Sequence, residues 1–593
     1  MISEEILKKA REWTASGFDD ETRHEVEELI ARNDERELVD RFYRELEFGT
    51  GGMRGIMAAG TNRMNLYTVG KATQGYADYL KSKADSGKLS GVALAFDSRN
   101  NSKLFAMEAA RVLAGNGLRV FIFPDLRPVP LLSFTVRYLG LDGGIVITAS
   151  HNPKEYNGYK VYGNDGGQVV WPEDEQIVDY VKRVDIIRGV KRIPYEDGIR
   201  KGLIKEPGDD VERAYLNNVQ NFLSKVKKGI IEELGTLNKK IRVVFTPLHG
   251  TGITLVPKVL GEIEGVDLIC EPEQSKPDGN FPTTTSPNPE ESVALSKAIE
   301  LAKKEDADLV IATDPDCDRM GLAARDSKGS FVVLNGNQIG CLLAWLLVHS
   351  YSKSGMLPPN PVIITTIVST ELIHAIAADF GISVIDVLTG FKYFAAKIRE
   401  FEEKGSHNFI YGFEESYGYL ADTFVRDKDG IIGSSLAALM MIYAVATSGS
   451  VIEMLNNIYR KYGLYREYGR SFALEGAEGV ERIRLLMKEM RENPPLSIGG
   501  NRITRIRDFL LLTEKLVQDN DVRPITGIPQ SNVLQFYTDG IKVSVRPSGT
   551  EPKIKFYFAF KMPVSGSIGE TSVFLDEKYK QVSSELFTRY GLV

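Results

Sequence analysis

Cysteine and histidine are both scarce in this chain. The three cysteines, Cys270, Cys317 and Cys341, are scattered over the sequence and form no CxxC pair. This arrangement argues against a disulfide framework and against a zinc knuckle. Six histidines in 593 residues are too few to indicate a histidine-rich metal protein. The cysteine usage fits a reducing compartment, and we expect a cytoplasmic protein.

The chain also lacks a long apolar run and a large charge of one sign. The apolar run IGCLLAWLLV near residues 339–348 is too short to span a bilayer and predicts a buried helix. The first residues, MISEEILKKAREW, are charged and amphipathic, unlike a signal peptide. The net charge of −7 argues against a general nucleic-acid binder but allows a small anionic substrate. We therefore expect neither a membrane nor a nucleic-acid partner.

Strands and helices are predicted to alternate along most of the sequence. Residues 1–47 have the apolar spacing of helices. Strand-like runs such as VALAF (92–96), GIVIT (144–148) and DLVIAT (308–313) then alternate with helical stretches. This rhythm indicates α/β domains with mixed or parallel sheets. Residues 532–560 instead alternate apolar and polar positions around tight turns, which predicts an antiparallel sheet.

We therefore expect three related α/β domains and a C-terminal α+β domain. A chain of this length should hold several domains, since one domain usually takes roughly 100–200 residues. The predicted ranges are 1–207 with the N-terminal helical extension, 208–327, 328–462 and 463–593.

The loop TASHNP follows the strand predicted at 144–148 and places Ser150 at its carboxyl end. In open α/β sheets, ligands bind beyond the carboxyl ends of the strands. A serine hydroxyl is a poor nucleophile unless a base, a metal ion or a charge activates it. No Gly-x-Ser-x-Gly elbow surrounds Ser150, so a hydrolase triad is disfavoured. Taken alone, this loop fits either a polar turn or a reactive serine.

The loop ATDPDCDRMG follows another predicted strand and carries three alternate aspartates. In an extended loop, this spacing points Asp314, Asp316 and Asp318 to one side. Carboxylates crowded in this way repel one another unless a cation neutralises them, and oxygen ligands suit magnesium or calcium. An EF-hand is a poor match, because its sixth and twelfth positions would be Arg319 and Arg325.

Two more loops carry polar side chains that suit a phosphorylated sugar. YGFEESYGYL offers Glu414, Glu415 and Ser416, which can exchange hydrogen bonds with sugar hydroxyls. VRPSGTEPK offers a guanidinium, two hydroxyls and a glycine turn, a combination that can hold a phosphate. An acidic turn and an ordinary hairpin turn remain the alternatives for these two loops.

TASHNP, DPDCDR, GFEES and RPSGTEP, in this order, resemble the four signature loops of the α-D-phosphohexomutase superfamily. The resemblance extends over almost the whole chain, from FGTGGMRG to KIKFYF. EESYG is closer to the phosphoglucomutase-type branch than to enzymes that carry Gly-Glu-Met-Ser-Gly-His, whose histidine falls at Gly418 here. The resemblance implies four domains in a heart shape around one central cleft, with one loop from each domain.

The resemblance also implies a role for each loop. Ser150 would carry a phosphoryl group, and Asp314, Asp316 and Asp318 would hold Mg²⁺ together with a phosphoserine oxygen. Lys160 matches the acid/base lysine of the family, with a pKa that would need to be lowered by burial and by Arg319, and His151 is a second candidate. The remaining site residues implied are Arg54 and Lys392 for positive charge, Glu414 and Ser416 for the sugar, Arg426 for substrate, and Arg546, Ser548, Gly549 and Thr550 for the remote phosphate.

The expected activity is that of a phosphoglucomutase acting through glucose 1,6-bisphosphate. A phosphopentomutase, a phosphomannomutase or a glucose-1,6-bisphosphate synthase on the same fold remains open, since the residues around 389–393 and 414–418 do not separate these sugars. A non-catalytic sensor and a metal-dependent phosphatase fit less well. The expected partner is a phosphorylated sugar, and the protein is expected to be a monomer or a homodimer.

Overall fold

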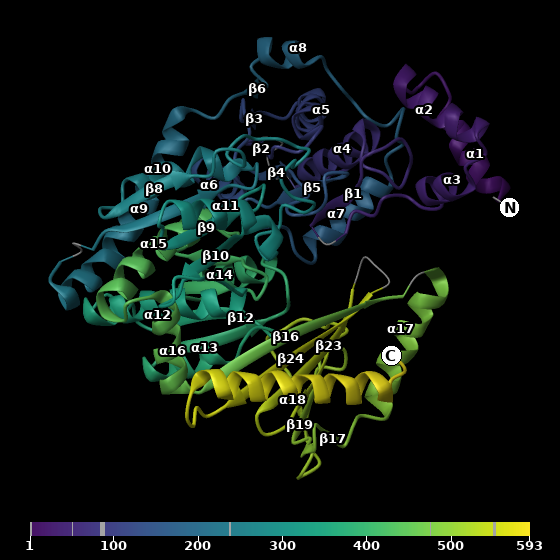
Figure 1. The fold of residues 1–593 in the computed structure, drawn as a ribbon. Helices are drawn as coiled ribbons and strands as arrows, with labels where there is room; N and C mark the ends of the chain where they lie inside the picture. The colour runs from purple at the N-terminus through teal and green to yellow at the C-terminus, as the bar shows by residue number, and fades with distance from the viewer. Residues whose placement is uncertain are drawn as a thin grey trace.

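The computed structural model describes residues 3–49, 51–83, 89–236, 239–474, 476–548 and 553–592. Within these residues, four large sheets follow one another along the chain, together with a two-stranded ribbon of β17 (Ser497–Ile498) and β18 (Asn501–Arg502). Figure 1 shows the C-terminal sheet and its helices at the bottom of the molecule and the N-terminal helices α1, α2 and α3 at the upper right. The predicted fold class is confirmed: three α/β domains and a C-terminal domain with an antiparallel sheet.

Three short helices form the N-terminal extension, each capped by a side chain that accepts from a backbone N–H. The caps are Ser3, Asp19 and Asp34. The helices pack Trp13, Phe18 and Phe42 around Tyr67 of the first domain. They are α1 (Glu4–Glu12), α2 (Asp20–Ala31) and α3 (Glu35–Phe42).

The first sheet is mixed, in the order β1-β5-β4-β2-β3-β6. Its central strands β2 and β4 are parallel and buried along their whole length, whereas β5 runs antiparallel to β4. The strands are β1 (Gly52–Ile56), β2 (Val92–Phe96), β3 (Val120–Ile122), β4 (Gly143–Ile147), β5 (Tyr156–Tyr162) and β6 (Ile204–Lys205). The helices are α4 (Leu66–Lys83), α5 (Ser102–Gly115), α6 (Val129–Tyr138), α7 (Glu173–Lys182) and α8 (Tyr195–Arg200).

The second sheet has the order β11-β10-β9-β7-β8, with β7, β8 and β9 parallel. Its strands are β7 (Ile241–Thr246), β8 (Val266–Cys270), β9 (Leu309–Thr313), β10 (Met320–Arg325) and β11 (Phe331–Leu334). Its helices are α9 (Asp209–Leu234), α10 (Val256–Gly261) and α11 (Ser292–Lys304), with a short 3₁₀ turn, η1 (Thr251–Thr254). Strand β11 extends this sheet past the boundary predicted at residue 327, because it pairs with β10.

The third sheet has the order β13-β12-β14-β15. The strands are β12 (Pro361–Thr366), β13 (Ser383–Val387), β14 (Asn408–Phe413) and β15 (Tyr419–Ala421). The helices are α12 (Gly336–Lys353), α13 (Leu372–Asp379), α14 (Lys392–Lys404), α15 (Gly430–Thr447) and α16 (Val451–Tyr462). The buried helix predicted near 339–348 is α12.

Helix α15 is apolar along its whole length. Among the described residues it alone is long and apolar enough to cross a membrane, but 83% of it is buried inside the protein. It packs against α9, α10 and α12, so it joins the second and third domains. This is the burial of a core helix.

The fourth sheet is antiparallel, in the order β16-β24-β23-β22-β19-β20-β21. Its strands are β16 (Leu464–Ala473), β19 (Arg505–Asp508), β20 (Thr513–Leu516), β21 (Asp521–Pro524), β22 (Leu534–Tyr537), β23 (Ile541–Pro547) and β24 (Lys553–Met562). Its helices are α17 (Gly476–Glu492) and α18 (Ile568–Arg589).

The fourth domain is attached to the third by an apolar cluster and by buried polar contacts. Ile367, Val368 and Leu388 of the third domain pack against Phe509, Ile525 and Val533 of the fourth. The Gln535 side-chain amide donates to the carbonyl of Ile367 at 2.6 Å. This contact holds the antiparallel sheet beside the carboxyl ends of β12 and β14.

Candidate functional site

Ser150 lies in a strained turn directly after β4. Its φ of +52° falls in the left-handed region, which costs a non-glycine residue of the order of 1 kcal/mol or more. The backbone N–H donates to Thr148 Oγ1 at 2.8 Å, which holds the turn. The side chain is buried, and its Oγ donates to Asp314 Oδ2 at 2.6 Å and accepts from Arg319 Nη1 at 2.6 Å. The hydroxyl therefore points from the first domain into the loop that follows β9.

Asp314, Asp316 and Asp318 lie together in that loop and are all buried. One carboxylate oxygen from each lies within 4.8 Å of the others. Within the described chain, the buried Oδ1 atoms of Asp316 and Asp318 accept no hydrogen bond. Three clustered carboxylates, two of which keep a buried oxygen without a hydrogen bond, fit a hard divalent cation. The structure thus brings together the three aspartates that the sequence predicted as metal ligands.

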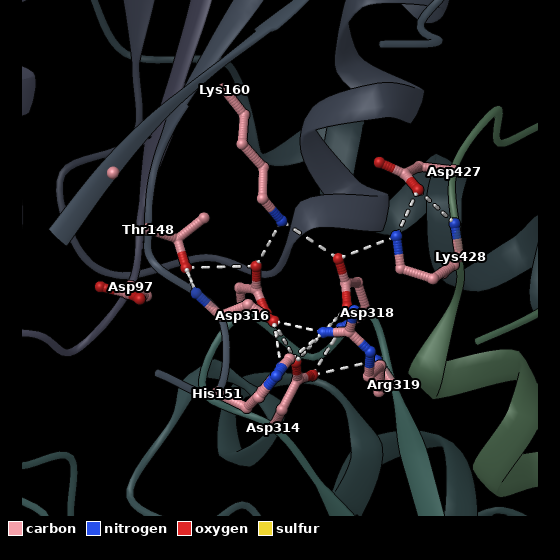
Figure 2. A network of polar contacts seen from close by, with 12 residues as sticks. Asp97, Thr148, His151, Lys160, Asp314, Asp316, Asp318, Arg319, Asp427 and Lys428 are labelled. Carbon is pink, nitrogen blue, oxygen red and sulfur yellow. Dashed lines mark hydrogen bonds and ion pairs between the residues drawn. The ribbon is translucent and has the colours of Figure 1, made fainter. Parts of the chain in front are cut away.

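Cations surround the aspartates from three sides (Figure 2). Lys160 of β5 lies 2.8 Å from Asp316 and 3.2 Å from Asp318. Lys428, in the segment before α15, lies 3.2 Å from Asp318 and 3.0 Å from Asp427. Arg319 adds a guanidinium between the aspartates and Ser150. The predicted site residue in this segment was Arg426, two positions before Lys428.

The charges in this network shift pKa values in opposite directions. Burial and repulsion by Asp316 and Asp318 hold the pKa of Asp314 well above its usual range. Burial acts the same way on Asp318, but Lys160, Lys428 and Arg319 outweigh it and hold its pKa far below the usual range. The protein's own cations thus neutralise only part of the negative charge of the three aspartates. The repulsion that remains acts on Asp314 and raises its pKa.

The expected lowering of the pKa of Lys160 is not found. Burial lowers the pKa of this ammonium, but the Asp316 and Asp318 carboxylates outweigh burial, so the pKa lies above its ordinary value. The expectation counted burial and Arg319 and left out two carboxylates in direct contact. In this arrangement, Lys160 holds its proton firmly.

His151 is a neutral imidazole at this site. Burial and the neighbouring Arg319 and Arg54 guanidinium groups lower its pKa well below the usual range. Its Nδ1 lies 2.8 Å from Arg319 Nη1 and 3.3 Å from Ser150 Oγ. Because Arg319 can only donate, Nδ1 acts as the acceptor and the proton lies on Nε2. His151 is thus a neighbour of the serine without a positive charge of its own.

Arg99 holds the loop of Ser150 in place through its backbone. Its guanidinium donates to the backbone carbonyls of Ser150, Asn152, Pro153 and Tyr156. The buried Asp97 carboxylate lies 3.3 Å from its Nε. Arg99 was not among the predicted site residues, because its contacts with the loop depend on how the chain folds back.

Replacing Arg99 by lysine should lower turnover about a hundredfold, because one ammonium cannot reach four carbonyls and the Ser150 loop would shift. The measurement is kcat and KM, together with the extent of Ser150 phosphorylation by added sugar bisphosphate. Arg111→Lys is the matched control in the same domain, since Arg111 contacts Glu108 and the Ile193 carbonyl. Wild-type turnover in Arg99→Lys would show that the loop does not need this support.

The loop between β14 and β15 meets the aspartate loop through Arg319, whose Nε donates to the carbonyl of Ser416 at 3.0 Å. Tyr417 has a φ of +64°, a second strained position. Glu414 is buried, and burial raises its pKa to about 7. Glu415 accepts from Thr366 and Ser369, at 2.9 Å and 3.3 Å. Of the two glutamates, Glu414 is the one free to accept from a ligand.

Three predicted residues contact partners outside the aspartate network. Arg54, which is exposed, donates to Asn152 Oδ1 at 3.0 Å. Lys392 pairs with Asp174 of α7 at 3.4 Å. Arg426 is buried and pairs with Glu402 of α14 at 2.5 Å, so the structure does not bring it to the aspartates.

The phosphate loop predicted in the fourth domain is described only in part. Gly549 and Thr550 lie outside the described residues. Arg546 of β23 is hydrogen-bonded to Tyr557, and Lys555 of β24 lies directly opposite it in the ladder. Directly paired residues share a face of the sheet, so Arg546 and Lys555 form a basic pair. Lys555 was not among the predicted site residues. The alternation of polar and apolar residues in KIKFYF (553–558) already places Lys553 and Lys555 on one face of the strand.

Comparisons with known proteins identify a family. Models of the phosphoglucomutase/phosphomannomutase alpha/beta/alpha domains I, II and III match residues 45–187, 214–329 and 335–462. A phosphoglucomutase of Staphylococcus epidermidis is 37% identical over 515 residues, which cover 86% of this chain and 90% of that protein. A phosphoglucomutase of Staphylococcus aureus is 36% identical over 547 residues, covering 91% and 94%.

Two solved structures share the fold. Parafusin from Paramecium, in an open form, gives a TM-score of 0.64 at 18% identity and covers 92% of this chain and 94% of that one. A phosphomannomutase from Thermus thermophilus gives 0.61 at 22% identity, covering 88% and 96%. At these identities, the likeness concerns the architecture alone.

Proposed function

Because this chain belongs to the phosphoglucomutase/phosphomannomutase family, we propose that it interconverts glucose 1-phosphate and glucose 6-phosphate. The reaction passes through a phosphoserine at Ser150 and a glucose 1,6-bisphosphate intermediate. One observation carries the proposal: the buried Ser150 hydroxyl lies 2.6 Å from both Asp314 and Arg319, beside three clustered carboxylates. We further propose that the protein is cytoplasmic and that it is a monomer or a homodimer.

Magnesium fits the donor set, since Asp314, Asp316 and Asp318 offer only oxygen atoms and two of these are buried without a hydrogen bond. When bound there with an oxygen of the phosphorylated Ser150, it would neutralise charge on the transferring phosphoryl group. Arg319 can act on the same group, because its Nη1 already touches Ser150 Oγ. Its guanidinium would stabilise the charge that develops on the phosphoryl oxygens.

Each half-reaction exchanges one phosphoryl group and one proton. The bond from phosphorus to Ser150 Oγ breaks, and a bond from phosphorus to the free sugar hydroxyl forms. The sugar hydroxyl loses its proton and Ser150 Oγ regains one. Lys160, with its Nζ between Asp316 and Asp318, is the proposed proton carrier. Mg²⁺ bound to these two carboxylates would offset the charge that holds the proton on Lys160. Neutral His151 is the second candidate.

The bisphosphate must then present its other end to Ser150. We propose that Arg546 and Ser548, with Lys555, Gly549 and Thr550, hold the phosphate that is not reacting. Glu414 and Ser416 would hold the sugar in either orientation, with Lys392 and Arg54 adding positive charge near the substrate. The buried Lys428 belongs with Lys160, because both neutralise Asp318.

The test is glucose 6-phosphate formation from glucose 1-phosphate, with Mg²⁺ and trace glucose 1,6-bisphosphate. Ribose 1-phosphate and mannose 1-phosphate are assayed in parallel. We expect glucose 1-phosphate to be turned over fastest. Slow glucose turnover with fast ribose turnover would identify a phosphopentomutase, a preference for mannose a phosphomannomutase, and net accumulation of bisphosphate a synthase.

A further inference from the structure

The segment 281–291 of the second domain lies across the catalytic loops, although none of its residues was predicted to act there. Ser286 Oγ donates to the carbonyl of His151 at 3.2 Å. Pro289 passes directly over Gly321, where a Cβ atom would come within 2.5 Å of the Pro289 carbonyl oxygen. Glycine is therefore required at 321 for this close approach. These two contacts place Glu290 next to Arg319.

Glu290 has a half-buried carboxylate with no protein partner. Across the described ranges, no hydrogen bond and no ion pair within 4 Å reaches it, and only its backbone N–H is bonded, to Asn288. Burial raises its pKa, while Arg319 and Lys555 act in the opposite direction and Glu415 adds to the effect of burial. The Glu290 carboxylate thus lies among groups from the second, third and fourth domains.

Glu414 is the second carboxylate beside Arg319 that keeps free acceptor atoms. It is buried, and no side-chain hydrogen bond to its carboxylate occurs among the residues that the structure covers. Arg319 lies within electrostatic range of both Glu290 and Glu414. Removing a carboxylate from water without a donor is costly, so the buried Glu414 and the half-buried Glu290 are arranged for donors that a ligand brings. Sugar hydroxyls are such donors, whereas phosphate oxygens are not.

We infer that Glu290 of the second domain binds ring hydroxyls of the sugar together with Glu414, and that the two carboxylates select a hexose phosphate over a pentose phosphate. The inference rests on the proposed function. In glucose 1-phosphate, three ring hydroxyls remain when the 6-hydroxyl reacts. Ribose 1-phosphate keeps only two when its 5-hydroxyl reacts. The three hydroxyls of the hexose extend around the ring and can donate to both carboxylates at once. The two remaining hydroxyls of the pentose are neighbours on one edge of its ring, so they reach one carboxylate and leave the other unpaired. A site with an unpaired buried polar group rejects the substrate that lacks the hydroxyl.

The test compares Glu290→Gln and Glu290→Ala with the wild type on glucose 1-phosphate and ribose 1-phosphate. Losing a hydrogen bond to a charged acceptor should lower kcat/KM for the hexose about tenfold to a hundredfold. The pentose should change less than about threefold by the same reasoning, because it does not engage both acceptors. Glu291→Gln is the matched control, since Glu291 is the exposed neighbour of Glu290.

A sugar-binding role has a second signature that a merely structural role would not give. A bisphosphate that has lost one sugar contact leaves the cleft more often during turnover. Glu290→Gln should therefore need a higher concentration of added glucose 1,6-bisphosphate to reach full rate, while its melting temperature stays near that of the wild type.

The outcomes separate the inference from the proposed function. An active wild type with equal losses on both sugars, or with no loss in either variant, overturns the role of Glu290 alone. A wild type that turns over no sugar phosphate overturns both. A selective loss on glucose 1-phosphate with a raised bisphosphate requirement supports the inference.

Discussion

Ser150→Ala should abolish mutase activity, with turnover at least about four orders of magnitude below the wild type. The size follows from removing the only proposed covalent carrier, so that two easier steps revert to one difficult step. The reacting Oγ is held by Asp314 and Arg319, and a methyl group can replace neither contact. The measurement is the coupled assay with added bisphosphate, together with intact-mass analysis for a phosphoryl group on the protein.

Ser286→Ala is the matched control for Ser150→Ala. Ser286 touches the same loop through the His151 carbonyl, and among the described residues its side chain makes no hydrogen bond to Ser150, to Arg319 or to the three aspartates. We expect its turnover to stay within about tenfold of the wild type, as for a single neutral hydrogen bond. If Ser150→Ala kept a hundredth of the wild-type rate or more, the phosphoserine mechanism would be wrong.

Removing the metal should have the second largest effect. Chelation of divalent cations, or Asp316→Asn, should lower turnover by about three orders of magnitude or more, because charge on the transferring group would lose its main neutralising partner. Asp316 is central to the cluster: its Oδ2 meets Lys160 at 2.8 Å and Thr148 at 3.1 Å, and its Oδ1 is buried and free.

The same site should give a stability signal that does not depend on activity. Mg²⁺ at about a hundred times its dissociation constant adds about 2.7 kcal/mol to the folded state, which raises the melting temperature by a few degrees. Asp316→Asn should lose most of this rise. In the absence of Mg²⁺ it should melt no lower than the wild type, because one of three repelling carboxylates is gone. A wild type whose melting temperature ignores Mg²⁺ would contradict the proposed metal site.

The sequence predicted the fold class and the family, and both are confirmed. The loop rule drew attention to Ser150 and the three aspartates, which the structure brings together, because both loops directly follow buried parallel strands. The same rule could not decide between Arg426 and Lys428 in the segment FVRDKDG (424–430). There, two basic side chains that are two residues apart contact different partners: Arg426 pairs with Glu402, while Lys428 pairs with Asp318. The sequence alone does not indicate which of these two side chains points toward the aspartates.

Two further differences between the sequence predictions and the structure also arise from contacts between distant segments of the chain. The direction of the pKa shift of Lys160 depends on two carboxylates from another domain. Glu290 stood in a proline-rich stretch with no strand directly before it, so no rule drew attention to it. Its place is set by Pro289 lying on Gly321. The predicted domain boundaries and the roles of the individual site residues stay predictions.

The three α/β domains are joined at the catalytic loops themselves, as well as through α15. The Asp316 carbonyl accepts from the backbone N–H of Val129, and the Asp316 carboxylate accepts from Thr148. Lys428, which balances Asp318, follows far later in the chain. During synthesis on the ribosome, the serine loop therefore emerges long before its acidic partners, and those partners emerge before their last cation. No fragment that ends before Lys428 can hold the complete set of charges, so a truncated product of translation would carry an unbalanced acidic cluster and no activity.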